Sequence, residues 1–255
     1  MQTTSRDNAD EQAVSITAGS VQLDGLLMVP ENAEGVVLLA HGGGSSLYST
    51  RNRYMAHVLH QSGLATLLIS LITHEEEAID VRTQQFRFDV ALLTERLVSA
   101  TDWLIHAPSS CHLRIGYLGD GIAGGAALLA ATMHPSAVGA IAIYNGQTDV
   151  APDQLACVQA PTLLIVNGND AEAIAMNQSA LSHIQAEKSF ERIASINHGF
   201  AEPGALEEVA RLASRWFKHY LTSDVPRTSP YNPADVQASL HHPADSGCSD
   251  RYPYA

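Results

Sequence analysis

Two side chains that could work together in acid–base chemistry follow two separate apolar runs of this sequence. Asp170 stands in Asn-Gly-Asn-Asp after the run 161–166, and His198 stands in Asn-His-Gly after the run 189–194. A carboxylate can orient an imidazole so that the imidazole accepts a proton from a hydroxyl, a thiol or water. Each residue alone also has an ordinary explanation, because Asp residues close Asx turns and loop histidines are often only hydrogen-bonded. Together they are candidates for a catalytic pair.

The group that such a pair would activate is expected at a sharp turn between an apolar strand and a helix. The strand run 113–118 breaks at a Gly-Asp-Gly turn, and small residues from Ala123 onward begin a helix. Gly119 and Ala123 are small enough to let the strand and the helix approach each other closely. Gly121, which lies between them, has no side chain that could attack a carbonyl carbon.

Asp120 is the carboxylate nearest to this turn, and two roles are open for it. The positive end of the following helix would stabilise it by roughly 0.3 to 1 kcal/mol. It could also act as the nucleophile itself, although Leu118 and Ile122 are then the flanking residues and are too large for such a turn. An ionised carboxylate would repel an oxyanion forming nearby, which disfavours ester chemistry.

A glycine-rich loop follows the buried strand that the run 36–40 predicts. The backbone N–H groups of Gly42, Gly43 and Gly44 can approach a ligand closely, and such groups can stabilise an oxyanion. A plain flexible turn is the alternative interpretation. His41 stands directly before these glycines and is interpreted as a structural residue that orients the loop.

The composition argues against several classes of function. A formal charge of -13 disfavours nucleic acid and anionic membranes as partners, so the expected partner is a small molecule, with a homodimer left open. His74 and the following Glu75–Glu77 read as a solvated acidic loop without a second histidine at helical spacing, so neither a metal nor another cofactor is expected. Three cysteines without CxxC spacing and a polar N-terminus predict a cytoplasmic protein.

The elements that must position these residues alternate between strands and helices. Strands are predicted from apolar runs at 14–17, 21–28, 36–40, 65–71, 113–118, 138–144, 161–166 and 189–194. Apolar residues at steps of three and four predict a long helix over 84–106 and a closing helix over 206–220. We therefore expect an α/β fold with a mostly parallel sheet, helices on both faces and an N-terminal antiparallel hairpin.

The same patterns predict one folded domain over residues 13–221. Residues 1–12 are expected to be disordered. Residues 222–255 are rich in proline and show no apolar periodicity, so we expect a flexible C-terminal tail.

These features together resemble bacterial α/β-hydrolases of the dienelactone hydrolase type over about residues 14–221. The resemblance rests on the His-Gly-Gly-Gly-Ser-Ser of 41–46, the Arg-Asn-Arg-Tyr of 51–54, Phe88-Asp89, the turn at 119–123, Asp170 and His198. It implies hydrolysis of ester or lactone bonds by a Ser or Cys nucleophile, with an Asp orienter and a His base following in that chain order.

Applied to this chain, the resemblance makes Asp170 the acid and His198 the base. It places the oxyanion donors at the backbone N–H of Ile122 and in the loop of Gly42 to Gly44. The position of the nucleophile falls on Gly121, so the route through a covalent acyl-enzyme is in doubt.

Two classes of function follow from this pattern. The first is a weak or altered hydrolase, in which His198 and Asp170 activate a water in the space that a serine side chain would fill. The alternative is a non-catalytic pseudoenzyme on the same fold, which binds a small molecule or regulates another protein.

Overall fold

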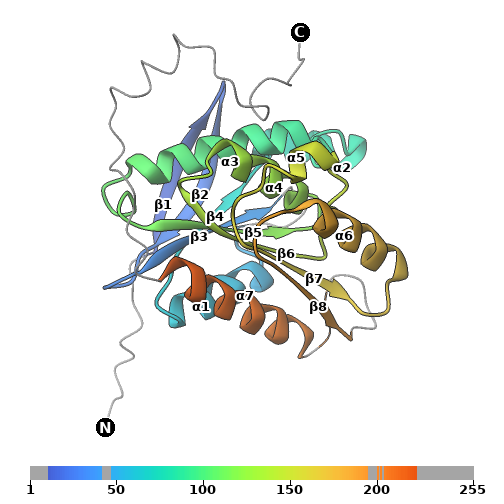
Figure 1. The fold of residues 1–255 in the computed structure, drawn as a ribbon. Coiled ribbons are helices and arrows are strands. Elements are labelled where there is room, and N and C mark those ends of the chain that lie inside the picture. The colour runs from blue at the N-terminus through green and yellow to red at the C-terminus, as the bar shows by residue number, and fades with distance from the viewer. Residues whose placement is uncertain (1–10, 42–46, 195–199, 201, 203, 223–255) are drawn as a thin grey trace, which may run out of the picture. The chain divides into compact units, whose positions relative to one another are not determined.

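A computed structural model describes residues 11–41, 47–194, 200, 202 and 204–222. The strands are β1 (Gln12–Ala18), β2 (Val21–Met28), β3 (Gly35–His41), β4 (Ala65–Ser70), β5 (Arg114–Asp120), β6 (Val138–Tyr144), β7 (Thr162–Asn167) and β8 (Lys188–Ile193). The helices are α1 (Thr50–Gln61), α2 (His74–Thr83), α3 (Val90–His106), α4 (Ala123–Met133), α5 (Pro152–Leu155), α6 (Ala171–His183) and α7 (Ala205–Leu221). Figure 1 shows the strands as one sheet between two layers of helices.

The sheet confirms the predicted topology. Its strand order is β1-β2-β4-β3-β5-β6-β7-β8. The β1–β2 hairpin and the β2–β4 pair are antiparallel, and all pairs from β4 to β8 are parallel. Gly19 turns the hairpin with a φ of +58°, a conformation that glycine adopts without steric cost. Because β3, β5, β6 and β7 are parallel, their carboxyl ends meet at one edge, where the candidate site lies.

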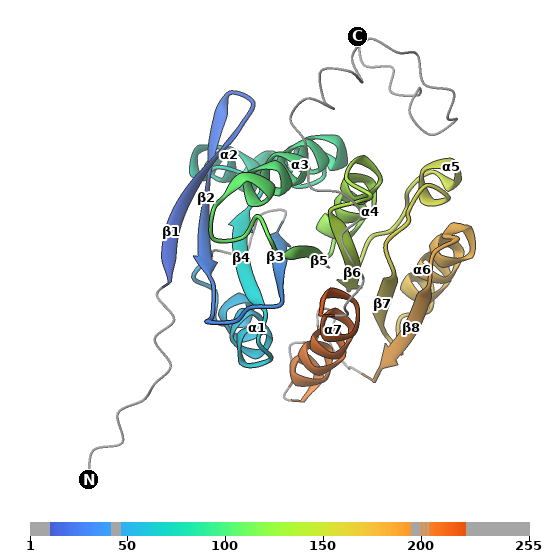
Figure 2. The same cartoon turned by 60° about the vertical axis from the view of Figure 1, so that its left-hand side comes forward.

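Two apolar layers, one on each face of the sheet, hold the fold together. Side chains alternate between faces along a strand, so Leu38 of β3 packs in one layer and Leu39 in the other. Helices α3, α4 and α6 cover the layer of Leu38, whereas α1 and α7 cover the layer of Leu39 (Figure 2). Buried Val, Leu, Ile and Ala along β3 explain why this strand sequence is continuously apolar.

The segment after β4 differs from the prediction. The acidic stretch expected as a loop is helix α2, and the long helix expected from residue 84 is α3, which begins at Val90. Thr73 starts α2 with a capping box: its Oγ1 accepts from the N–H of Glu76 at 3.2 Å, and Glu76 Oε2 accepts from the N–H of Thr73 at 2.8 Å. Three glutamates in the first turn also suit the positive end of the helix.

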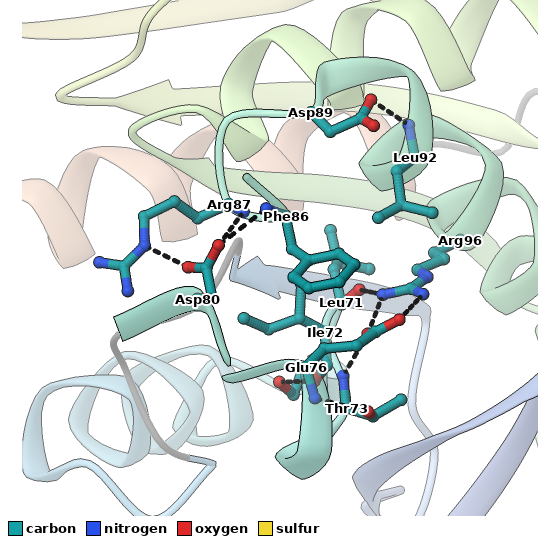
Figure 3. Close-up of polar contacts among 11 residues, drawn as sticks. Leu71, Ile72, Thr73, Glu76, Asp80, Phe86, Arg87, Asp89, Leu92 and Arg96 are labelled. Carbon is teal, nitrogen blue, oxygen red and sulfur yellow. Dashed lines mark hydrogen bonds and ion pairs between the residues drawn. The ribbon is translucent and has the colours of Figure 1, made fainter. Parts of the chain in front are cut away.

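Two ion pairs, each with one buried member, join α2 to α3 and to the segment between them (Figure 3). Arg96 of α3 donates to both carboxylate oxygens of Glu76, at 2.6 and 2.5 Å, and to the carbonyl oxygen of Leu71 at 2.7 Å. Asp80, at the other end of α2, is fully buried and accepts from the side chain of Arg87 and from the N–H of Phe86. The segment predicted to be solvated is therefore fixed to the core by charged side chains.

The remaining predictions on the ends of the chain fall mostly outside the described residues. All described residues belong to one unit, which ends at Thr222. Strand β1 begins at Gln12, inside the segment expected to be disordered, and Thr222 caps α7. Residues 1–10 and 223–255 are not among those described, so their expected disorder stays a prediction. No helix within the described ranges has the length and apolar content needed to cross a bilayer.

Candidate functional site

The turn between β5 and α4 has the predicted close packing of strand against helix. A Cβ atom on Gly119 would lie 2.8 Å from the Cα of Gly124, which no real contact tolerates. A Cβ on Gly124 would lie 2.5 Å from Cγ2 of Ile143 in β6. Glycine at these positions lets the helix begin directly against the sheet, with its N-terminus at the carboxyl edge.

Gly121 forms the tip of this turn. Its φ is +59°, and a Cβ added there would meet no atom of the described residues within 4 Å. The Gly121 carbonyl oxygen accepts from the N–H groups of Gly124 at 3.1 Å and Gln147 at 3.0 Å, which fixes the turn in place. A side chain at this position would enter open space, yet the residue present has none.

Asp120, the last residue of β5, pairs with a cation. Its Oδ2 lies 3.9 Å from Nη2 of Arg51, and the two side chains are 24% and 29% exposed. Arg51 also lies over the ring of Tyr144, with its guanidinium carbon 5.2 Å from the ring centroid. Burial raises the pKa of Asp120, while Arg51 and hydrogen bonds from Tyr144 and Asn145 act in the opposite direction.

Asp120 stands directly before the N-terminus of α4, the position in which we expect the helix to stabilise it. The structure adds a second partner, Arg51 of α1, which the sequence pattern did not indicate. The neighbouring Arg53 forms an ion pair of its own, with Glu11 at 2.6 Å.

His41 ends β3 beside this group. Its neighbour Ala40 pairs with Gly119, so His41 lies next to Asp120 at the edge of the sheet. The side chain is 5% exposed, and its Nε2 has no hydrogen-bond partner in the described part of the chain. Burial, and then the charge of Arg51, lowers the pKa of His41 to about 4. His41 is therefore neutral near pH 7, in agreement with a structural role.

Asp170 lies at the same edge of the sheet, beyond the end of β7. It is the N-cap of α6, and its Oδ1 accepts from the N–H of Ala173 at 2.9 Å. Its predicted place after a buried strand is confirmed, and its capping role accounts for one carboxylate oxygen. His198 and the loop of Gly42, Gly43 and Gly44 lie outside the described residues, so their predicted contacts stay predictions.

The structure therefore places Asp120, Gly121 and Ile122 together at the turn, where Ile122 is the N-cap residue of α4. Asp170 lies at the same edge of the sheet, two strands away. Sequence reasoning missed the roles of Tyr144, the last residue of β6, and Asn145, which follows it; both hydrogen-bond to the Asp120 carboxylate. Their position at the end of an apolar strand run was the available signal. Within the described ranges, no three His, Cys, Asp or Glu side chains are grouped as a metal ion would require.

Comparison with protein sequences places this chain among longer proteins. No protein-family model matches it. It is 43% identical over 216 residues to two proteins from strains of Mycobacterium tuberculosis that bear a provisional phosphoribosyl transferase name. The match covers 85% of this chain and 48% of each relative. The chain thus spans about half the length of the curated relatives it matches.

Comparison with solved structures identifies the family. A dienelactone hydrolase from Anabaena variabilis is 55% identical, with a TM-score of 0.80 over 83% of this chain and 98% of that one. Est1E from Butyrivibrio proteoclasticus shares the fold at 12% identity, with a TM-score of 0.68 over 81% of this chain and 98% of its own. At such identity and coverage, the first comparison is decisive: this chain belongs to the dienelactone hydrolase family of α/β-hydrolases.

Proposed function

We propose that this chain binds a small carboxylic ester or lactone at the carboxyl edge of the sheet and hydrolyses it weakly, through water rather than through an acyl-enzyme. The observation that carries the proposal is Gly121 itself. It holds the φ of +59° at the tip of the turn, and no described residue occupies the space where a side chain would stand. This turn between β5 and α4, called the elbow below, packs closely through its small residues, and Gly121 offers no side-chain atom for covalent attack.

The chemistry assigned to the site needs only groups that the chain supplies. His198 accepts a proton from a water molecule placed in the space above Gly121, and the water oxygen then bonds to the carbonyl carbon. The N–H of Ile122 donates to the oxyanion that forms. His198 next passes the proton to the departing alkoxide as the ester C–O bond breaks, and Asp170 holds the imidazole in the correct orientation.

The expected rate is low. Enzymes of this mechanistic class that have lost their triad keep roughly 10³- to 10⁴-fold acceleration over water, through the oxyanion hole and substrate binding. That range is the scale on which a Gly121 enzyme should be measured.

One observation favours the second candidate, a binding or regulatory protein without catalysis. Asp120 places a carboxylate next to the turn, 3.9 Å from Arg51. When ionised, that carboxylate disfavours the build-up of negative charge on a tetrahedral intermediate. It does not disfavour the binding of a neutral ester or lactone, so binding would survive where turnover fails.

We do not extend the transferase name of the Mycobacterium tuberculosis relatives to this chain. A name given to a whole protein need not describe the half that is matched, and the chain covers 48% of each relative. Ester or lactone chemistry is supported instead by the dienelactone hydrolase that is 55% identical over nearly its whole length.

Steady-state hydrolysis of an activated aryl ester tests the proposal, with the unmodified protein compared with His198→Ala and Asp170→Asn. The water route predicts slow turnover without a burst, lost in His198→Ala and reduced in Asp170→Asn. A thermal-shift titration with neutral esters and lactones is run beside it. If the protein binds these compounds but shows no turnover above the His198→Ala variant, the second candidate, a binding protein, replaces the hydrolase. If it shows no binding and no turnover, both candidates are contradicted.

A further inference from the structure

A cavity lies away from the elbow, on the face of the sheet that α1 and α7 cover. Its volume is about 470 Å³, and it is lined by β7, β8 and α7, with no residue of the elbow among its lining. Pockets for small molecules are typically about 300 to 1,000 Å³. The cavity is therefore large enough for a ligand of its own.

The edge of the sheet explains why a hollow forms there. Ser189 and Glu191 of β8 pair with Leu163 and Ile165 of β7, so these side chains share one face of the sheet. Leu163 is covered by α7, but β8 lies at the edge of the sheet beyond that helix (Figure 2). The last strand thus presents a hydroxyl and a carboxylate on a face that α7 only partly covers, which leaves a space along the helix.

The helix side of this cavity is positively charged, although the whole chain carries -13. Arg215 and Lys218 are exposed and lie three residues apart, so they project from the same side of α7. Among the described residues, neither makes a side-chain hydrogen bond or an ion pair. The nearby Arg211, by contrast, is held by Glu208 at 2.7 and 2.5 Å.

Lysine usage makes Lys218 more notable. The chain has two lysines, and the other, Lys188, donates to the carbonyl oxygens of Leu181 at 2.8 Å and Ile184 at 2.6 Å. Lys188 therefore serves the end of α6. Lys218 lies in the last turn of α7, where its charge suits the negative end of the helix, but its ammonium group donates to no described residue. The one carboxylate in the lining, Glu191, acts on Arg211 outside the cavity.

An aromatic ring completes the wall. Trp216 is half-buried, and its Nε1 donates to the carbonyl oxygen of Pro161 at 3.4 Å. Its ring packs against Tyr220 with centroids 4.6 Å apart and planes at 59°. These two contacts fix the indole, and the rest of its surface lines the cavity. In the sequence, Trp216 stands between Arg215 and Lys218, which line the same cavity. Fixed indole rings favour stacked or edge-on contacts with planar ligands.

We propose that this cavity binds a small planar anion, with its ring against Trp216 and its anionic group between Arg215 and Lys218. The planar part accounts for the fixed indole and the apolar floor at Leu163. The anionic part accounts for two exposed cations whose side chains make no hydrogen bond or ion pair within the described chain, although the charge of Arg215 also acts on Glu208. The site is separate from the elbow and does not depend on the proposed hydrolysis.

Tryptophan fluorescence gives a direct test, because the chain has two tryptophans, Trp103 and Trp216. Trp103 lies on α3, in the opposite apolar layer, and Trp103→Phe leaves Trp216 as the only reporter. Benzoate should change the emission of this variant saturably. Benzamide, which is planar but neutral, and cyclohexanecarboxylate, which is charged but not planar, should bind several-fold more weakly.

Charge variants in the same background identify the residues. Arg215→Gln and Lys218→Gln should each weaken benzoate binding by about 3-fold, and the pair by about 10-fold, as expected for partly exposed charges. Arg82→Gln removes an exposed cation of α2, outside the lining, and should leave binding unchanged. Glu191→Gln should tighten it. All four positions are at the surface or partly exposed, so folding is checked by circular dichroism.

Any of three results would overturn the proposal. One is the absence of a saturable response of Trp216 to benzoate. Another is equal affinity in the Arg215→Gln/Lys218→Gln variant and its parent. A response lost in Gly121→Ser would assign the ligand to the elbow and would equally contradict a separate site.

Discussion

In the function proposed here, the missing side chain of Gly121 is the main difference between this chain and a hydrolase with a covalent nucleophile. At Gly121 the backbone conformation, the close approach of Gly119 to Gly124 and the open space beyond the turn are all present. The adjacent residue, Asp120, introduces a carboxylate, and burial raises the pKa of this group. In this proposal the missing nucleophile affects the attack on the carbonyl carbon, whereas the neighbouring charge affects the stabilisation of the oxyanion. Single variants at Gly121 and Asp120 can therefore separate the two effects.

Restoring the nucleophile should restore activity in part. Gly121→Ser places a hydroxyl in open space, at a φ of +59° that costs about 1 kcal/mol for a residue with a side chain. We expect slow burst kinetics with an activated aryl ester, and a larger burst in Gly121→Ser/Asp120→Asn, because Asn keeps hydrogen-bonding capacity without the charge. A folded double variant with no activity above wild type would mean that the site has diverged beyond the nucleophile.

His41 should make the protein sensitive to acid. Its pKa is about 4 in the folded protein and 6.5 in the unfolded chain, so the unfolded state binds more protons between these values. The free energy of unfolding therefore falls as the pH falls from 6.5 to 4, by about 3 kcal/mol from this residue. Urea unfolding at several pH values checks this, with His41→Gln as control.

In His41→Gln the free energy of unfolding should depend less steeply on pH, by the equivalent of about one bound proton. This difference does not depend on what the other histidines contribute. Equal slopes for the two proteins would show that His41 is not the buried neutral group. A lower stability of His41→Gln at every pH does not affect this comparison, because only the slopes are compared.

At the scale of elements, strands were predicted well, whereas α2 was expected as a loop and α5 and α6 were not predicted. Long apolar runs such as that of β3 show directly that a strand is buried on both faces. Helix α2 shows no apolar periodicity, because its one buried residue is Asp80. The capping box of Thr73 and Glu76 was the local signal for its start.

The site divides along the same line. Its glycines and Asp170 could be placed from residues next to strand ends, since the carboxyl ends of parallel strands meet at one edge. The pair of Arg51 and Asp120 could not, because the two residues are far apart in the sequence and meet only when α1 packs on the sheet. Contacts of that kind depend on tertiary packing, which no local pattern contains.

The ion pair that anchors α2 should be a sensitive point of the fold. The side chains of Arg96 and Glu76 are 5% and 16% exposed. Glu76→Gln leaves a buried guanidinium without its charge partner, and loss of one member of such a pair costs about 3 to 5 kcal/mol. Urea unfolding measures the loss. Glu77→Gln, which removes the same charge from the next residue of α2, should change the midpoint little, and equal losses would contradict the anchoring role.

At the scale of the whole molecule, one sheet joins two apolar layers. The layer under α3, α4 and α6 and the layer under α1 and α7 take alternate residues from the same strands. The elbow lies where the layers meet the carboxyl edge, since β5 contributes Tyr117 to one and Leu118 to the other. The geometry of the site should therefore depend on both layers.

Two neighbouring residues of β3 test that coupling. Leu38 and Leu39 are both buried, at 0% and 1% exposure, but they pack on opposite faces. Leu38→Ala and Leu39→Ala should each lower the free energy of unfolding by about 2 to 5 kcal/mol, through lost burial and the cavity left behind. Because both layers share the same strands, each variant should still unfold in one cooperative transition, with fluorescence and far-ultraviolet circular dichroism giving the same midpoint.

Trp103 reports on the α3 layer and Trp216 on the α7 layer, so single-tryptophan variants can follow each layer separately. Midpoints that differ between the two reporters in Leu39→Ala but not in the parent would show that the α7 layer can open alone, and the elbow would then be supported by the α3 and α4 side only.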